Sequence, residues 1–305
     1  MELKKDFEER YQELLKDKYE EFKEYSSKYI TKAIRVNTLK ISVEDLKKRL
    51  EDRWNLIPVP WCKEGFWITY KDGDRFDIGN LPEHQLGYIY VQDPASMIPP
   101  VVLNPKPHDI VLDMCSAPGS KTTQLAMYMD NKGMLIANDE SGKRLSALGL
   151  NLTRCGVSNT IINHMRGEQV KGEYDKISVD APCSGTGTIR RNFKIAEMYS
   201  FGLVKRMQSI QKKLIRKAYQ LLKKGGILVY STCTLEPEEN EEVIDYLLKE
   251  FEDAEVLDIE LNINRQPAIL EFENKKYDPR VSKCLRILPQ DNDTEGFFVC
   301  KIQKK

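Results

Sequence analysis

Between residues 108 and 232 the sequence alternates short apolar runs, rich in β-branched residues, with longer segments of helical spacing. Apolar runs of about four to eight residues have the length of buried strands, and a helix between two such runs is the usual connection between parallel strands. The sequence therefore predicts an α/β fold, in which helices cover a parallel sheet. The predicted strands are HDIVLDM, MLIAND, NTIINH, DKISVDAP and GILVYSTC.

The first third of the chain mixes helical and extended patterns. Apolar residues of the segment 3–22 recur near helical spacing with charges between them, which is typical of an amphipathic helix. The segment 61–75 alternates polar and apolar residues and then reaches Asp72-Gly73, a pattern that favours a hairpin. We therefore expect a small α+β domain over residues 1–87, followed by a larger α/β domain over residues 88–305.

Composition excludes several classes of protein. The 305 residues include 47 basic and 47 acidic side chains, and 41% of the residues are hydrophobic, which is unlike a disordered chain. No apolar run approaches the roughly 18 residues of a membrane helix, and the first residues lack the apolar core of a signal peptide. Seven cysteines without a CxxC pair argue against a structural zinc site. We expect a cytoplasmic protein with free thiols, no bound metal and no membrane partner.

The balanced total hides an uneven distribution of charge. Residues 188–224 contain eleven Lys or Arg and a single acid, whereas residues 236–260 contain twelve acids and a single base. This layout indicates a basic face on the protein surface. A basic stretch of this kind is either a solvated helix face or a track that binds phosphates.

A loop of small residues follows the first predicted strand. Small side chains allow a ligand to approach the backbone closely, and the N-terminus of the next helix offers free N–H groups. Because ligands of open α/β sheets bind at the carboxyl ends of strands, the loop is predicted to bind a nucleotide or nucleoside. It matches neither the GxxxxGK[ST] nor the GxGxxG pattern. The loop consists of Cys115, Ser116, Ala117, Pro118, Gly119, Ser120 and Lys121.

Asp139 ends the second predicted strand. An acid at this place in the architecture hydrogen-bonds ribose hydroxyls, so Asp139 is a candidate ligand of the same nucleoside. The alternative is that Asp139 only caps the helix that follows.

Two cysteines stand in loops directly after predicted strands. Cys183 follows Asp180-Ala181-Pro182, and Cys233 follows Ser231-Thr232. Both loops face the same crevice of a parallel sheet, and a thiolate is a strong nucleophile. The cysteines outside these loops and the first loop are interpreted as small buried apolar residues; they are Cys62, Cys155, Cys284 and Cys300.

Three motifs in this order, DMCSAPGSK, DAPCSGTG and STCTLEPEENE, resemble those of the RNA cytosine-5 methyltransferases of the Nol/Nop/Sun family. The similarity extends to RVNTLK near the start, to VQDPASM before the first predicted strand and to RILPQDNDTEGFFVCKI at the end. It covers the chain from about Arg35 onwards, and the archaeal tRNA enzymes are the members that the chain resembles most.

The resemblance implies a Rossmann-like methyltransferase sheet that uses S-adenosylmethionine, preceded by a small RNA-binding domain. The loop from Cys115 to Lys121 would hold the methionine and ribose parts of the donor, Asp139 its ribose hydroxyls, and Arg144 and Asp180 would complete the donor site. Members usually have an Asp after the third strand, near the adenine. Here Met165 stands at about that place, with Arg166 next to it.

The resemblance also implies a covalent mechanism. The thiolate of the TC motif, Cys233, attacks C6 of cytosine and so activates C5, while Asp180 stabilises charge at N3 and N4 of the ring. Cys183, the cysteine of the PC motif, then assists breakdown of the adduct. DNA cytosine-5 methyltransferases attack with the PC cysteine instead, so the additional TC cysteine distinguishes the RNA enzymes.

A base inside a helix cannot reach such a crevice, so the target cytosine must be flipped or unpaired. We expect Arg190, Arg191 and Lys194 to bind RNA phosphates. Arg35, Asn37 and Lys40 of RVNTLK are either RNA-binding or ordinary surface residues. The expected substrate is tRNA. The alternatives are ribosomal RNA, a small-molecule methyl acceptor, and a non-catalytic RNA-binding or ribosome-assembly factor.

Overall fold

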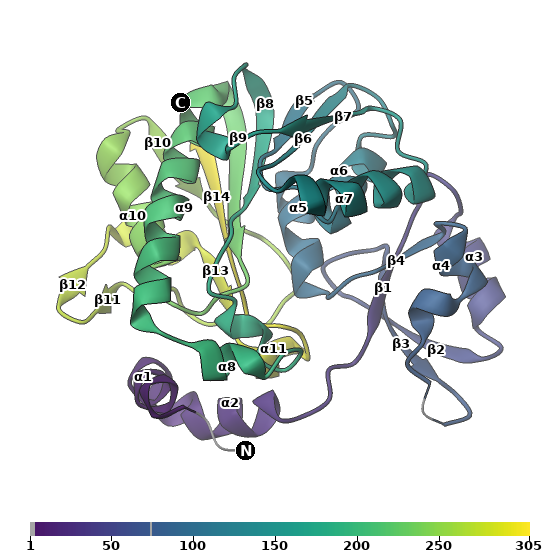
Figure 1. Cartoon of the computed structure of the whole chain (residues 1–305), viewed down its shortest axis with the longest axis horizontal. Helices are drawn as coiled ribbons and strands as arrows, with labels where there is room; N and C mark the ends of the chain where they lie inside the picture. Colours follow the sequence, from purple (N-terminus) through teal and green to yellow (C-terminus); the bar gives the residue numbers. More distant parts are fainter. Residues whose placement is uncertain (1–3, 74) are drawn as a thin grey trace.

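The computed structural model describes residues 4–73 and 75–305 and contains two main sheets (Figure 1). The larger sheet has the strand order β10-β14-β9-β8-β5-β6-β7. All five predicted strands are present and pair in parallel, so the Rossmann-type α/β fold is confirmed. They are β5 (Ile110–Asp113), β6 (Met134–Asp139), β7 (Thr160–His164), β8 (Tyr174–Asp180) and β9 (Leu222–Thr232).

The order of the parallel strands reverses at β5, which pairs with β6 on one side and with β8 on the other. Ligands of doubly wound sheets bind at this kind of reversal, beyond the carboxyl ends of the strands. The loop that begins at Cys115 and the loops that carry Cys183 and Cys233 all leave the sheet at this edge. The topology therefore gathers the predicted functional segments at one place.

Two antiparallel strands complete the large sheet. β14 (Phe297–Lys304) lies between β9 and β10 (Ala254–Leu257), and the short β13 (Leu285–Ile287) pairs with β14. An apolar run such as FFVCKI indicates a buried strand, but the direction of a strand depends on the path of the chain before it. The sequence pattern did not predict these strands. A small hairpin of β11 (Glu271–Phe272) and β12 (Lys275–Lys276) lies outside the sheet.

Helices cover both faces of the large sheet (Figure 1). On one face α5, α6 and α7 pack against Val111, Leu135 and Ala137. On the other face α9 and α10 pack against Leu112, Ile177 and Leu228. Neighbouring strand residues thus alternate between two cores, as expected for a sheet buried on both faces. The bounds are α5 (Ile98–Leu103), α6 (Ser120–Tyr128), α7 (Gly142–Cys155), α9 (Phe201–Leu221) and α10 (Glu241–Glu250), with the short α8 (Lys194–Met198) and α11 (Pro289–Asn292) in connecting loops.

The smaller sheet is antiparallel and forms the N-terminal α+β domain, with the order β2-β3-β1-β4. Because β4 pairs with β1, the predicted boundary between residues 87 and 88 would separate a strand from its own sheet, so the small domain includes β4. Gly87, in a left-handed conformation with φ of +73°, turns the chain within this domain. The elements are β1 (Ala33–Val36), α3 (Val43–Leu50), β2 (Trp54–Pro58), β3 (Gly65–Tyr70), α4 (Pro82–Gln85) and β4 (Ile89–Val91).

The expected hairpin at Asp72-Gly73 is wrong, because β3 pairs with the strand before it. The chain turns between residues 59 and 64, where the backbone N–H of Cys62 donates to the carbonyl of Val59. Alternation predicted the strand correctly but could not indicate which neighbouring segment is its partner.

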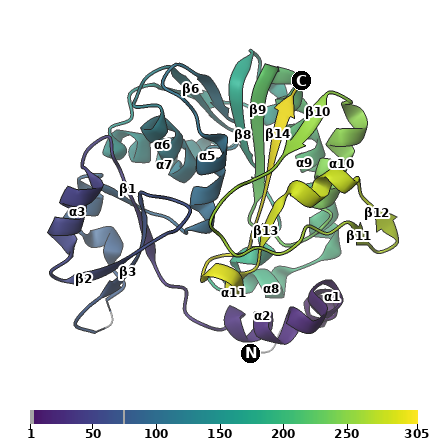
Figure 2. The same cartoon turned by 180° about the vertical axis from the view of Figure 1, so that it is seen from behind.

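The amphipathic segment at the N-terminus is helical, but it packs on the large domain and not on the small sheet (Figure 2). It forms α1 (Lys5–Leu15) and α2 (Tyr19–Ser26); residues 1–3, where the expected helix began, lie outside the described residues. Phe7, Tyr11 and Phe22 are buried against Tyr199, Val204 and Leu235. None of the helices in the described ranges is both long and apolar enough to span a bilayer.

Candidate active site

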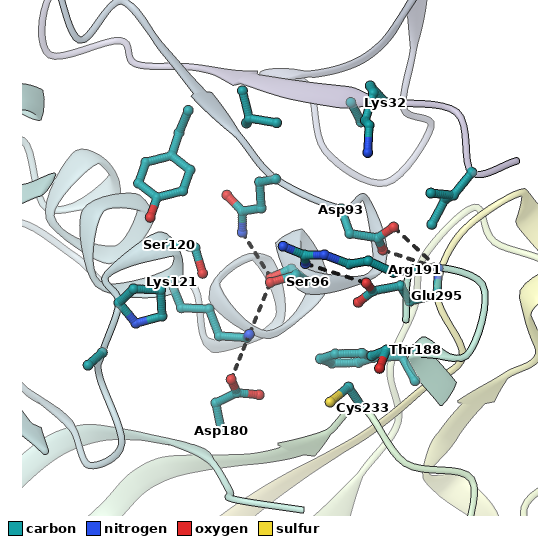
Figure 3. Close-up of a pocket in the computed structure, with 18 of the residues that line it drawn as sticks. Lys32, Asp93, Ser96, Ser120, Lys121, Asp180, Thr188, Arg191, Cys233 and Glu295 are labelled. Carbon is teal, nitrogen blue, oxygen red and sulfur yellow. Dashed lines mark hydrogen bonds and ion pairs between the residues drawn. The ribbon is translucent and has the colours of Figure 1, made fainter. Parts of the chain in front are cut away.

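Two adjoining cavities lie at the carboxyl edge of the large sheet. The strand-end cavity, of about 490 Å³, is bounded by the ends of β5, β6 and β8 and by α9. The interdomain cavity, of about 460 Å³, lies between residues 30–33 and 90–93 of the small domain and the carboxyl edge of the large sheet (Figure 3). Three residues line both cavities: Arg144, Asp180 and Cys233.

The first loop is held tightly beneath both cavities. Asp113 at the end of β5 accepts a hydrogen bond from Thr122 Oγ1 (2.7 Å), and burial raises the pKa of this carboxyl to about 7. Gly119 has φ of +108°, and a Cβ there would lie 2.9 Å from the Leu148 side chain. The chain therefore requires glycine at this turn. Cys115 lines the strand-end cavity, whereas Ala117, Pro118, Ser120 and Lys121 line the interdomain cavity. Ser116 is buried, with its hydroxyl bonded to the carbonyl of Asn138.

Asp139 lies at the end of β6 and lines the strand-end cavity, as the sequence predicts for a nucleoside ligand. Its carboxylate also accepts hydrogen bonds from the backbone N–H groups of Ala117 (3.1 Å) and Ser141 (3.0 Å). Arg144 forms an ion pair with it (3.3 Å) and donates to the carbonyl of Ala117. Asp139 thus organises the loop and faces the cavity at once, so the geometry accommodates both interpretations of this residue.

The wall beyond the third strand differs from the expectation at Met165. The side chain of Met165 packs against the core, and its carbonyl accepts a hydrogen bond from Asn138 Nδ2 (3.1 Å). Arg166, Gly167 and Glu168 form the wall instead. Glu168 is an acid at the cavity that the sequence interpretation missed, because it stands three positions beyond the place where an acid was sought.

Lys121 and Asp180 form an ion pair inside the interdomain cavity (Figure 3). Lys121 Nζ donates to Asp180 Oδ2 (2.8 Å) and to Ser96 Oγ (3.0 Å), and Ser231 Oγ donates to Asp180 Oδ1 (2.9 Å). Burial lowers the pKa of Lys121, but the adjacent Asp180 outweighs this effect and raises it overall. The site therefore presents a cation and an anion side by side.

The two predicted cysteines meet at the boundary between the cavities. Their sulfur atoms lie 3.3 Å apart, and both thiols are free. Cys183 lines the strand-end cavity, whereas Cys233 lines both cavities. The hydrogen bond with Cys233, together with burial, raises the pKa of Cys183 well above its usual value. Cys233 is thus the thiol that a ligand in either cavity can reach.

The loop after Cys233 is anchored by buried acids. Arg10 of α1 donates to Glu236 (3.1 Å) and to Glu238 (2.6 Å), and Arg286 pairs with Glu241 (3.0 Å). The first acids of the acid-rich segment over residues 236–260 are therefore in the interior and paired. The density of acids directly after the TC motif was the available signal.

Glu239 connects the loops of the two cysteines. Its Oε2 accepts hydrogen bonds from the backbone N–H of Ser184 (3.0 Å) and from Gln211 Nε2 (2.8 Å), while Thr234 Oγ1 donates to Oε1 (3.4 Å). The hydroxyls of Ser184 and Thr234 lie 2.8 Å apart. Burial raises the pKa of Glu239 to about 7. Sequence reasoning did not single out this residue.

The expectation that Arg35 and Asn37 contact RNA is wrong, because both side chains are buried between the domains. The Arg35 guanidinium donates to Gln92 Oε1 (2.8 Å), the carbonyl of Ser120 (2.8 Å) and Thr123 Oγ1 (2.8 Å). Asn37 donates to the carbonyls of Gly87 and Cys155, both at 2.8 Å.

Lys40 is exposed, but its ammonium group donates to the carbonyls of Leu86 (3.0 Å) and Arg154 (2.8 Å). RVNTLK thus joins the small domain to the first loop and to α7. A local pattern cannot distinguish such a joint from a polar surface.

The three basic residues that were predicted to bind RNA phosphates have different environments in the structure. Only 1% of the Arg190 side chain is exposed, and it donates to the carbonyl of Tyr29 (2.8 Å) and to Asp293 (2.8 Å), so Arg190 is a structural residue. Arg191 is 70% exposed and lines the interdomain cavity beside Glu295. Lys194 is exposed at the start of α8. Across residues 4–73 and 75–305, no group of three or more His, Cys, Asp or Glu side chains is placed to hold a metal ion.

The chain was compared with known protein families. Residues 100–303 match the family model described as 16S rRNA methyltransferase RsmB/F, and residues 3–94 match the N-terminal domain of 16S rRNA methyltransferase RsmF. The chain belongs to this family. The resemblance to RNA cytosine-5 methyltransferases, based on the sequence motifs, is thereby confirmed. The matched ranges also agree with a domain boundary after β4.

Relatives of known name differ in their substrate. The chain is 47% identical over 300 residues to the tRNA (cytosine(49)-C(5))-methyltransferase of Pyrococcus abyssi, covering 97% of this chain and 94% of the relative. It is 44% identical to the Ribosomal RNA small subunit methyltransferase F of Aliivibrio salmonicida, but spans only 60% of that protein's length.

Solved structures support the fold. A methyltransferase homolog protein from Pyrococcus horikoshii superposes with a TM-score of 0.87 at 41% identity, covering 97% of this chain and 94% of that one. The structure of NSun6 from Pyrococcus horikoshii with SFG gives a TM-score of 0.84 at 24% identity, covering 99% and 98% of the two chains, and supports the fold alone.

Proposed function

We propose that the protein transfers a methyl group from S-adenosylmethionine to C5 of a cytosine in tRNA. The observation that carries this proposal is the position of Cys233 on a wall shared by two cavities, one at the nucleoside-binding strand ends and one between the domains. A thiol at this junction can bond to a base in one cavity while the base faces a methyl donor in the other. The printed name of the Pyrococcus relative supports tRNA as the substrate.

The residues of the strand-end cavity suit this donor. Asp139 provides a carboxylate at the place where nucleoside hydroxyls bind, and the first loop supplies a glycine turn with no room for a side chain. A cavity of about 490 Å³ falls in the range of cofactor sites. When bound there, S-adenosylmethionine supplies an electrophilic methyl group. Cys115, Asp139 and Arg144 line this cavity and would hold and orient the donor, while the rest of the loop supports them from the neighbouring cavity.

In the interdomain cavity the chain activates the base. C5 of cytosine is a weak nucleophile until the thiolate of Cys233 bonds to C6, which makes C5 an enamine carbon. Charge then arrives on the ring nitrogen N3. The Lys121 ammonium and the Asp180 carboxylate, 2.8 Å apart, present a donor and an acceptor for the polar edge of cytosine.

Cys183 acts after methyl transfer. The hydrogen bond with Cys233, together with burial, raises the pKa of Cys183 well above its usual value, which suits a group that acts late in the reaction. After methyl transfer Cys183 gives its own proton to solvent and, as a thiolate, takes the proton from C5. The C5–H electron pair restores the C5–C6 double bond, the C6–sulfur bond breaks, and Cys233 leaves as a thiolate.

RNA contacts follow from the exposed cations around the interdomain cavity. Lys32 and Arg191 line it, and Arg191 is available to a phosphate. A further basic groove on α9, lined by Lys212, Lys213, Arg216 and Lys217, adjoins the strand-end cavity through Lys213. These groups suit a flipped nucleotide whose backbone continues across the surface.

A second substrate, ribosomal RNA, is favoured by the names of the bacterial relatives, of which the chain spans about 60%. The deciding experiment incubates the purified protein and S-adenosylmethionine with unmodified tRNA or with small-subunit ribosomal RNA and maps 5-methylcytosine by bisulfite sequencing. The Cys233→Ala variant serves as the control. We expect a modified cytosine in tRNA; modification of ribosomal RNA alone would assign the second substrate, and modification of neither would refute the function.

A further inference from the structure

A buried acid, Glu295, lines the interdomain cavity close to Cys233. Only 5% of this residue is exposed, and among the described residues nothing hydrogen-bonds to its Oε1 atom. Its charged neighbour is Arg191, whose Nη1 atom lies 3.6 Å from Oε1. A buried carboxylate oxygen normally has a hydrogen-bond donor, so the carboxylate of Glu295 has unused hydrogen-bonding capacity in a side chain that lines the cavity.

The backbone fixes Glu295 at this position. Its N–H donates to both carboxylate oxygens of Asp93 (3.3 and 3.4 Å), and the next residue, Gly296, donates to the carbonyl of Gly187 (2.8 Å). Burial and the neighbouring Glu295 raise the pKa of Asp93 to about 8. Asp93 and the loop that contains Gly187 thus fix the backbone at Glu295.

The bond between Cys233 and C6 also determines where the ribose of the same nucleotide lies. Cys233 bonds to C6, and C6 is bonded to N1, which carries the ribose. In Figure 3, Thr188, Arg191 and Glu295 lie on the Cys233 side of the cavity, whereas Lys121 and Asp180 lie on the other side. A cytosine whose polar edge meets Lys121 and Asp180 therefore directs its ribose towards Glu295.

We propose that Glu295 accepts a hydrogen bond from the ribose 2′-hydroxyl of the target nucleotide, and that Arg191 binds the phosphate attached to that ribose. This subsite rests on the proposed function and makes the enzyme select RNA over DNA, because the 2′-hydroxyl is the donor that DNA lacks. Arg191 suits the phosphate because its exposed guanidinium has donors beyond the ion pair with Glu295.

A cross-comparison of enzyme and substrate tests the subsite. Two RNA oligonucleotides are methylated by the parent protein and by Glu295→Ala; they differ only in a 2′-deoxy sugar at the target cytosine. The parent is expected to lose about 10- to 100-fold in kcat/KM on the deoxy substrate, the range of a hydrogen bond to a charged group. On the all-ribose substrate, kcat/KM of Glu295→Ala is expected to be lower than that of the parent by the same factor. On the deoxy substrate, kcat/KM of Glu295→Ala should equal that of the parent.

The matched control is Glu197→Gln, an exposed acid on α8, which should retain the full preference of the parent. The subsite would be overturned if the parent methylated the two substrates at equal rates. It would also be overturned if the deoxy sugar lowered kcat/KM by the same factor in the parent and in Glu295→Ala. Glu295→Gln keeps a neutral acceptor and should retain part of the preference, which covers the case that the alanine variant does not fold. No methylation of all-ribose RNA by the parent would instead contradict the proposed function.

Discussion

Cys183 Sγ lies 3.3 Å from Cys233 Sγ, although the two residues stand in loops that follow different strands, β8 and β9. The contact gives the thiols unequal properties. Cys183 has a raised pKa and lines one cavity, while Cys233 lines both. This difference supports the proposed order of events, in which Cys233 forms the early bond and Cys183 removes the proton late.

The first prediction separates these roles. Cys183→Ala should accumulate a covalent protein–RNA species that survives denaturing electrophoresis, because attack at C6 remains possible and release is slow. Cys233→Ala should lose both methylation and the species, and the double variant should show neither. A species that appears with Cys233→Ala would reverse the two assignments.

The second prediction concerns the donor. Asp139→Ala should weaken S-adenosylmethionine binding by about 1.5–3 kcal/mol in calorimetry, since a charged acceptor of the ribose is lost. Lys143→Ala, at an exposed position on the adjacent helix α7, should bind as the parent does. Unchanged affinity of the Asp139 variant would show that this residue does not bind the donor and only orders the loop through its hydrogen bonds to the backbone.

The third prediction is a pH dependence of stability. Burial raises the pKa of Glu239 to about 7 in the folded protein, whereas the ordinary pKa of this carboxyl, expected in the unfolded chain, is 4.5. The contribution of this group is therefore fully present below pH 4.5 and is lost as the pH rises to about 7. Relative to the parent, Glu239→Gln should gain up to about 3 kcal/mol of unfolding free energy across this window. A pH-independent difference in urea denaturation would contradict the raised pKa.

The fourth prediction concerns Arg10. Arg10→Ala leaves Glu236 and Glu238 buried without their cation, which should lower the free energy of unfolding by about 3–5 kcal/mol. Lys5→Ala on the same helix removes only an exposed ion pair with Glu9 and should change it by less than about 1 kcal/mol. Similar losses in urea denaturation of the two variants would show that the Arg10 pairs contribute little.

The fifth prediction uses salt. The logarithm of the RNA association constant should fall with the logarithm of salt concentration, and Arg191→Ala should reduce the slope by about 0.7 if it removes one phosphate contact on a single strand. Arg190→Ala should leave the slope unchanged and reduce thermal stability, because its side chain is bonded within the protein. Equal slopes for the parent and the Arg191 variant would show that this guanidinium does not bind phosphate.

Residues at strand ends were predictable because a parallel sheet brings the carboxyl ends of its strands to one edge. For this reason the alternation of strands and helices was sufficient to predict that Asp139, Asp180, Cys183 and Cys233 lie close together. Arg35 and Arg190 were misjudged because their partners, such as Gln92 and Asp293, are distant in the sequence. The same limit applies to Glu295, whose position depends on Asp93 of the other domain and has no local signature.

The packing of α1 and α2 beneath the large domain has a consequence for synthesis. Their aromatic face, with Phe7 and Tyr11, leaves the ribosome long before Tyr199, Val204 and Leu235, against which it is buried. The apolar face of these two helices therefore stays uncovered until the chain has been synthesised to about residue 235. We expect chaperones to protect this exposed face while the catalytic domain is still being synthesised.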